Sequence, residues 1–73
     1  MKWVKKSWFL NREWELFNED GALLATIYRG YRDGLWRVEF RDYKIQNALN
    51  LPPYNTRENL TKVVEKVLTN GKL

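Results

Sequence analysis

The 73-residue chain contains no cysteine and no histidine, and Ser7 is its only serine. These absences exclude disulfides, zinc sites built from cysteine or histidine, iron–sulfur clusters and histidine pH switches. They also exclude nucleophilic catalysis by Ser-His-Asp or Cys-His arrangements. We therefore expect a protein that is not an enzyme and that uses neither a cofactor nor a metal.

Long apolar runs and phosphate-binding glycine loops are also missing. No segment approaches the run of about 20 apolar residues that spans a membrane. The basic start, Met1 to Lys6, resembles the first part of a signal peptide, but the apolar stretch Trp8-Phe9-Leu10 is too short to complete one. We expect a cytoplasmic protein with no membrane partner.

Basic residues outnumber acidic ones, 13 to 9, and they are unevenly spread. Residues 1–12 carry four bases and no acid, whereas residues 13–28 carry four acids and no base. The net charge of +4 indicates an anionic partner only weakly, and an ordinary solvated surface is the more common reason for such a charge. The hydrophobic share of 44% is typical of a globular domain.

The C-terminal part shows the period of a helix. Its apolar residues fall at i, i+3, i+4, i+7 and i+8, namely Leu60, Val63, Val64, Val67 and Leu68. Asn55 and Thr56 are both candidate N-caps, and Asn70-Gly71 is a typical helix stop. This pattern predicts a helix over about 56–69.

Before Pro52-Pro53 the period is two, which is the period of strands. The segments 13–17, 22–32 and 35–41 are separated by a four-residue loop over 18–21 and by Asp33-Gly34, which favours a two-residue turn. These turns predict that Ile27 faces Phe40 and that Leu16 faces Leu23. Both registers place one apolar set on a single face: Trp14, Leu16, Leu23, Ala25, Ile27, Trp36, Val38 and Phe40.

We therefore predict an α+β fold, an antiparallel meander of three or four strands packed on one C-terminal helix (ββββα). The expected single domain covers 1–73, with a basic aromatic arm or first strand over 1–12, the meander over 13–41, a connection over 42–55 and the helix over 56–69. Two points stay open. Residues 3–10 form an edge strand or extend the strand at 13–17, and residues 43–49 form a short strand or a helical turn.

The opposite face of the predicted sheet mixes arginines with an aromatic residue. Cations neutralise phosphates, and an exposed ring offers a base a stacking surface. This pattern favours binding of DNA or RNA, with the basic arm as a second contact. The candidate contact residues are Tyr28, Arg32, Arg37, Glu39, Arg41, Lys5 and Lys6.

Two segments also resemble a known DNA-binding family. Residues 28–32, Tyr-Arg-Gly-Tyr-Arg, and residues 36–42, Trp-Arg-Val-Glu-Phe-Arg-Asp, are similar to the ethylene-response-factor domain and to related three-stranded domains of integrases. The likeness extends loosely to residue 58. The resemblance implies a DNA-binding sheet and assigns contacts to Arg29, Gly30, Arg32, Glu39 and Arg41.

Unassigned aromatic side chains offer a second class of function. Trp3, Trp8, Phe9 and Phe17 have no place in the predicted core. Exposed aromatic residues are typical of binding hot spots, so these four side chains point to a protein partner or to self-association. In this alternative the chain is a small interaction or inhibitor module of the kind found in phages and mobile elements.

Overall fold

The computed structural model describes residues 1–6 and 12–70 and shows four antiparallel strands and two helices. The strands are β1 (Lys2–Lys5), β2 (Glu13–Phe17), β3 (Leu23–Arg29) and β4 (Trp36–Phe40), and they form one sheet in the order β1-β2-β3-β4. The helices are α1 (Tyr43–Ala48) and α2 (Arg57–Asn70). This arrangement is the α+β fold that the sequence predicts.

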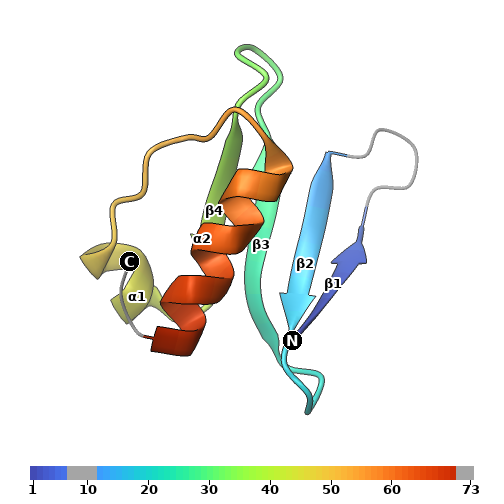
Figure 1. The fold of residues 1–73 in the computed structure, drawn as a ribbon, viewed down its shortest axis with the longest axis vertical. Helices are drawn as coiled ribbons and strands as arrows, with labels where there is room; N and C mark the ends of the chain where they lie inside the picture. Colours follow the sequence, from blue (N-terminus) through green and yellow to red (C-terminus); the bar gives the residue numbers. More distant parts are fainter. Residues whose placement is uncertain (7–11, 71–73) are drawn as a thin grey trace.

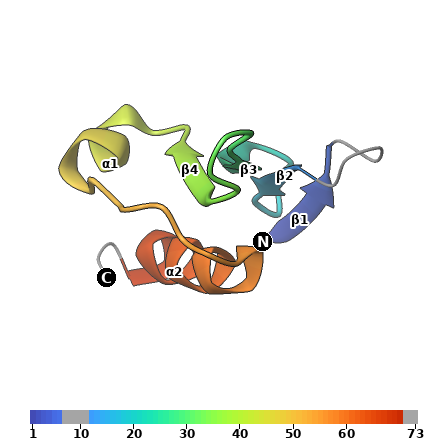
Figure 2. The same ribbon diagram turned by 90° about the horizontal axis from the view of Figure 1, so that it is seen from above.

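Helix α2 lies against one face of the sheet, which forms a second layer (Figures 1 and 2). The buried core between the two layers consists of Leu16, Ala25, Ile27, Trp36, Phe40, Leu60, Val64 and Val67. Trp14 and Val38 pack against this core from the same side of the sheet. The predicted alternation is therefore confirmed for seven of the eight residues that it assigned to the inner face.

Both predicted hairpin registers are wrong by two residues. Ile27 pairs with Val38 and Leu16 pairs with Ala25. The second hairpin does not turn at Asp33-Gly34 alone, because its loop runs from Gly30 to Leu35 and is closed by a hydrogen bond from the Gly30 N–H to the Leu35 carbonyl. Since strands alternate with a period of two, a shift of two leaves each side chain on its predicted face.

Leu23 is the exception to the predicted inner face. The pairing of β2 with β3 is interrupted by a bulge, so that Leu23 pairs with Phe17 while Ala25 already pairs with Leu16. The extra residue, Leu24, reverses the alternation at this point, and Leu24 packs against the core in place of Leu23.

For residues 43–49 the sequence allowed either a short strand or a helical turn. The structure shows helix α1 there. Asp42 caps this helix, because its side chain accepts a hydrogen bond from the Lys44 N–H at 2.9 Å. The Gln46 side chain accepts a hydrogen bond from the Phe40 N–H at 2.8 Å. This bond satisfies the Phe40 N–H at the free edge of β4. A strand edge with unsatisfied N–H groups tends to pair with strands of other chains.

Helix α2 starts where the sequence places it, and the structure decides between its two candidate caps. The Thr56 hydroxyl accepts a hydrogen bond from the Asn59 N–H at 3.2 Å, so Thr56 is the N-cap. Before it, Tyr54 exchanges two backbone hydrogen bonds with Trp36 at the edge of β4. Among the residues described here, no helix is both long enough and apolar enough to cross a membrane.

Candidate nucleic-acid interface

The outer face is the side of the sheet turned away from α2, and its strand residues lie in three cross-strand rows. The first row is Glu13, Tyr28 and Arg37, which are cross-strand partners. The second row is Val4, Glu15, Thr26 and Glu39, and the third is Lys2, Phe17 and Leu23. The second row contains two acids and no base, so the outer face as a whole is not a continuous basic surface.

Arg37 of the first row and Lys6, which lies opposite Glu13, are both paired with acids. The Lys6 ammonium lies 3.1 Å from Glu13 and 4.0 Å from Glu15, and the hydrogen bond and charge of Glu13 raise the pKa of Lys6. Across the sheet, Arg37 donates two hydrogen bonds to the Asp33 carboxylate, at 2.6 and 3.2 Å. These bonds, together with one from the Leu35 N–H, lower the pKa of Asp33 to about 2.

Arginine is concentrated at one end of the molecule. Five of the six arginines lie where β2 begins, β3 ends and β4 begins, or at the first residue of α2: Arg12, Arg29, Arg32, Arg37 and Arg57. We call this the arginine end; it is the upper end in Figure 1. With Lys6 it holds six bases against three acids, Glu13, Asp33 and Glu58. The net charge of +3 makes it a focus of positive potential.

Backbone contacts hold two of these guanidinium groups in place. The Arg29 Nε donates to the Gly34 carbonyl at 3.0 Å, and an Arg12 Nη donates to the Gly30 carbonyl at 3.4 Å. The Arg12 guanidinium also lies over the ring of Tyr31, 4.4 Å from its centroid. Arg29 and Arg32 make no ion pair with any residue that the structure describes, so their charges are available to an anionic ligand.

Gly30 and Gly34 shape the loop at the arginine end. Gly34 has φ +70°, in the left-handed region that favours glycine. Gly30 lies next to the ion pair between Asp33 and Arg37. A Cβ atom added at Gly30 would lie 2.7 Å from the Arg37 Nη1 atom and 2.7 Å from the Asp33 Oδ1 atom. A side chain at Gly30 would displace the pair between Asp33 and Arg37.

The structure brings some of the predicted contact residues together and separates others. Tyr28, Arg32, Arg37 and Lys6 lie at the arginine end. Lys5 pairs with Trp14 and so belongs to the α2 side of the sheet. Glu39 lies in the acidic second row, and Arg41 follows β4 at the opposite end of the sheet. Lys5 and Arg41 therefore lie apart from the others, whereas Glu39 shares the outer face with Tyr28 and Arg37.

The arginine end also includes Arg12, Arg29 and Arg57. Strand alternation in the sequence did not place these three residues on the contact surface. Only the family resemblance named Arg29 as a contact. In the structure it is the exposed last residue of β3 and pairs with the core residue Trp36, so it lies at the arginine end on the α2 side of the sheet. Arg12 and Arg57 were not predicted, because their positions depend on the packing of distant segments. Arg57 lies over the ring of Trp14 at 4.2 Å.

The aromatic residues assigned to a protein interface have different places. Trp3 is half-buried against the core, and its indole Nε1 donates a hydrogen bond to Glu65 of α2 at 2.8 Å. The assumption that Trp3 has no place in the core is therefore wrong. Phe17 is half-buried between its strand partners Lys2 and Leu23. Trp8 and Phe9 lie outside the described residues.

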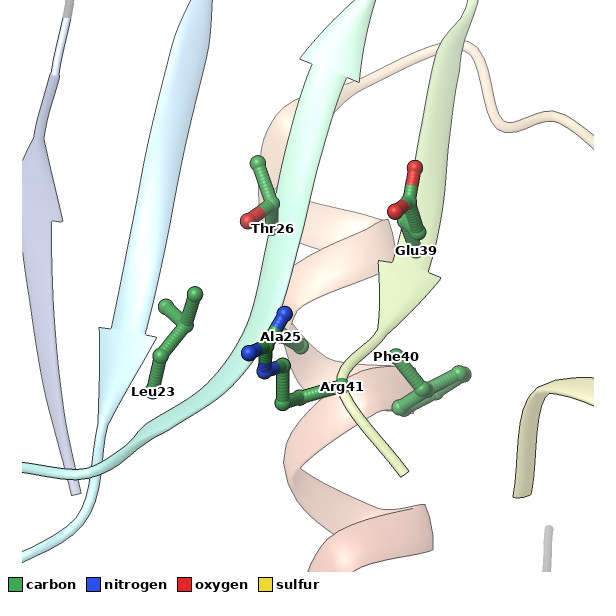
Figure 3. Close-up of a pocket in the computed structure, with 6 residues that line it drawn as sticks. All are labelled: Leu23, Ala25, Thr26, Glu39, Phe40 and Arg41. Atoms are coloured by element: carbon green, nitrogen blue, oxygen red, sulfur yellow. The ribbon is translucent and has the colours of Figure 1, made fainter. Parts of the chain in front are cut away.

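A shallow hollow lies on the outer face, near the end of the sheet opposite the arginine end. Leu23, Thr26, Glu39 and Arg41 contribute side chains to it (Figure 3). Its volume of about 50 Å³ is small beside the roughly 300–1,000 Å³ of ligand pockets, so we assign no nucleobase to it. Within residues 1–6 and 12–70, no group of acidic side chains is arranged to hold a metal ion.

Comparison of the chain with family models, with curated proteins and with solved structures finds no match. The resemblance to the ethylene-response-factor domain therefore depends entirely on residues 28–58. Any assignment of function has to come from the charges and geometry of this chain.

Proposed function

We propose that this protein binds nucleic acid, without catalysis, through the arginine end. The observation that supports the proposal is the placement of five of six arginines at one end of the sheet. Phosphate contacts supply most of the affinity in non-specific nucleic-acid binding. Arg29 and Arg32 are the strongest candidates for these contacts, since neither is neutralised by an acid in the described structure.

Arginine suits this role better than lysine would. Its planar guanidinium donates two parallel hydrogen bonds to a phosphate, and it is more weakly hydrated than an ammonium group. At the arginine end two of the guanidinium groups are also held by backbone carbonyls. Groups that are ordered before binding lose less conformational entropy when the ligand arrives.

A salt titration tests the proposal. Labelled oligonucleotides of about 15 nucleotides, single-stranded and duplex, are titrated with the protein at about 50 and about 200 mM salt, with fluorescence anisotropy as the readout. Contact with about four phosphates of a single strand weakens binding on the order of 50-fold between these conditions. If neither oligonucleotide binds at about 50 mM salt, the proposal is wrong.

Two double variants distinguish binding at the arginine end from a general attraction by net charge. Arg29→Gln with Arg32→Gln removes two charges at the arginine end, and we expect the slope of log K against log salt to become shallower by roughly 1.4 on a single strand. Lys62→Gln with Lys66→Gln removes two charges from exposed positions of α2 and should leave the slope unchanged. If both double variants lower the salt slope by the same amount, net charge alone attracts the ligand.

A further inference from the structure

Tyr31 combines high exposure with a fixed neighbour. Its side chain is 80% exposed, the largest value among the exposed large apolar or aromatic residues of the described chain. The Arg12 guanidinium lies over the ring, 4.4 Å from the centroid, and the same guanidinium is bonded to the Gly30 carbonyl. The ring is thus supported from one face while most of its surface is open to solvent.

An open ring of this kind binds a flat, apolar partner by stacking. A large exposed aromatic side chain contributes nothing to the core, and here the Arg12 guanidinium lies on its ring and Arg32 follows it in the chain, so nearby positive charge favours an anionic ligand. A nucleotide joins both properties in one molecule, because its base is a flat ring and its phosphate is an anion. The cation beneath Tyr31 also fixes the ring by a cation–π contact, which reduces the entropy lost on stacking.

Stacking on Tyr31 requires an unpaired base. In a duplex each base is already stacked between its neighbours and presents only its edge in a groove. In a single strand, or in a loop, the base faces are accessible to aromatic side chains. The arginine end therefore matches the chemistry of single-stranded nucleic acid better than that of a duplex.

We propose that Tyr31 is a stacking platform for one unpaired base, while Arg29 and Arg32 bind the flanking phosphates, so that the ligand is single-stranded DNA or RNA. This inference rests on the nucleic-acid binding proposed above and adds the class of ligand. Tyr28 is a second, weaker candidate platform, since it is 36% exposed and lies in the row that contains Arg37.

The test compares the parent protein with Tyr31→Ala on labelled oligothymidine and oligouridine of about 15 nucleotides and on a DNA duplex of the same length. We expect both single strands to bind more tightly than the duplex. Loss of one base–aromatic stack should weaken single-strand binding between about 5- and 150-fold and leave the slope against log salt unchanged, because no phosphate contact is lost. Duplex binding should be unaffected.

Two variants serve as controls. Tyr31→Phe keeps the ring and should bind as the parent does. Tyr43→Ala removes a tyrosine that is 70% exposed on α1, away from the arginine end, and should have no effect. Because Tyr31 and Tyr43 are both exposed, neither substitution disturbs the core. Addition of oligothymidine should also shift the ring-proton NMR signals of Tyr31 and not those of Tyr43.

The outcomes distinguish this inference from the function on which it depends. Equal affinity for duplex and single strand, with Tyr31→Ala unchanged, would overturn the stacking role and leave nucleic-acid binding standing. Absence of binding to all three oligonucleotides at about 50 mM salt would overturn both. A difference between the DNA and RNA single strands identifies which of the two is the better ligand.

Discussion

Asp33 is the residue that organises the arginine end. Its carboxylate accepts hydrogen bonds from the Leu35 N–H at 3.0 Å and from two nitrogens of Arg37. One side chain therefore orders the loop between β3 and β4 and orients an arginine of the outer face. It also neutralises that arginine, so Asp33 limits the positive charge of the site while it fixes the geometry.

The pKa of Asp33 leads to a prediction of pH dependence. Its folded value of about 2 lies below the ordinary value of 3.8, so the ionised carboxylate stabilises the fold. This contribution is fully present above about pH 4 and is lost as the pH falls toward 2. The carboxyl carbon of Asp33, followed by NMR, should titrate near pH 2.

A variant that removes the partner of Asp33 is the control for this titration. In Arg37→Gln the Asp33 carboxylate loses the guanidinium that donates to it, so the pKa of Asp33 should rise toward its ordinary value of 3.8. An unchanged pKa of Asp33 in this variant would mean that the pair between Asp33 and Arg37 does not form in solution.

At the scale of elements, the contact of α2 with the sheet holds the fold together. Leu60, Val64 and Val67 of this helix are buried against β3 and β4 residues. The helix contains β-branched residues with low helix propensity, so packing rather than intrinsic preference stabilises it. The sheet in turn depends on α2 to cover the inner face.

Leu60→Ala tests this dependence. Leu60 is fully buried, so truncation should lower the free energy of unfolding by about 2–5 kcal/mol. A domain of this length has a total stability of roughly 4–11 kcal/mol, so the loss is a large part of the whole. Urea unfolding followed by tryptophan fluorescence measures the difference.

An exposed position on the same helix is the control for Leu60→Ala. Lys62→Ala should change the free energy of unfolding by no more than about 0.5 kcal/mol. A cost of less than about 1 kcal/mol for Leu60→Ala would contradict the close packing of α2 on the sheet.

The elements were more predictable than their exact pairing. The spacing of apolar residues predicts both the strands and α2, because burial of one face imposes a period on the sequence. Register depends on turn geometry, and here side chains decide it. The Asn18 side chain accepts hydrogen bonds from the N–H groups of Asp20 and Ala22, and Asp33 bonds Leu35 and Arg37. These side-chain hydrogen bonds stabilise loops whose geometry the turn residues alone do not predict, so the registers differ from those expected.

At the scale of the whole molecule, the two ends of the sheet differ in charge. The arginine end carries the loop over 30–35, whereas the opposite end carries the loop with Glu19 and Asp20 (Figure 1). The sequence indicated arginines and aromatic residues on adjacent strands. It could not show which of them are neutralised, because the pairs of Lys6 with Glu13 and of Arg37 with Asp33 depend on register and loop closure.

The separation of the two ends predicts how distant charges affect binding. The seven residues of β3 span roughly 20 Å between them, whereas the Debye length is about 8 Å at 0.15 M salt. Glu19→Gln with Asp20→Asn raises the net charge by two at the far end, and Asp33→Asn raises it by one at the arginine end. In about 0.15 M salt we expect Asp33→Asn to tighten single-strand binding, because Arg37 is freed, and the double variant to leave the affinity within about twofold.

Low salt provides the internal check on this comparison. At about 0.01 M salt the Debye length rises to about 30 Å, which exceeds the length of β3. Under these conditions the double variant at the far end should also tighten binding, and fluorescence anisotropy measures both variants at both ionic strengths. If the far-end variant already matches Asp33→Asn in about 0.15 M salt, total charge governs the affinity, and the arginine end has no special part in binding.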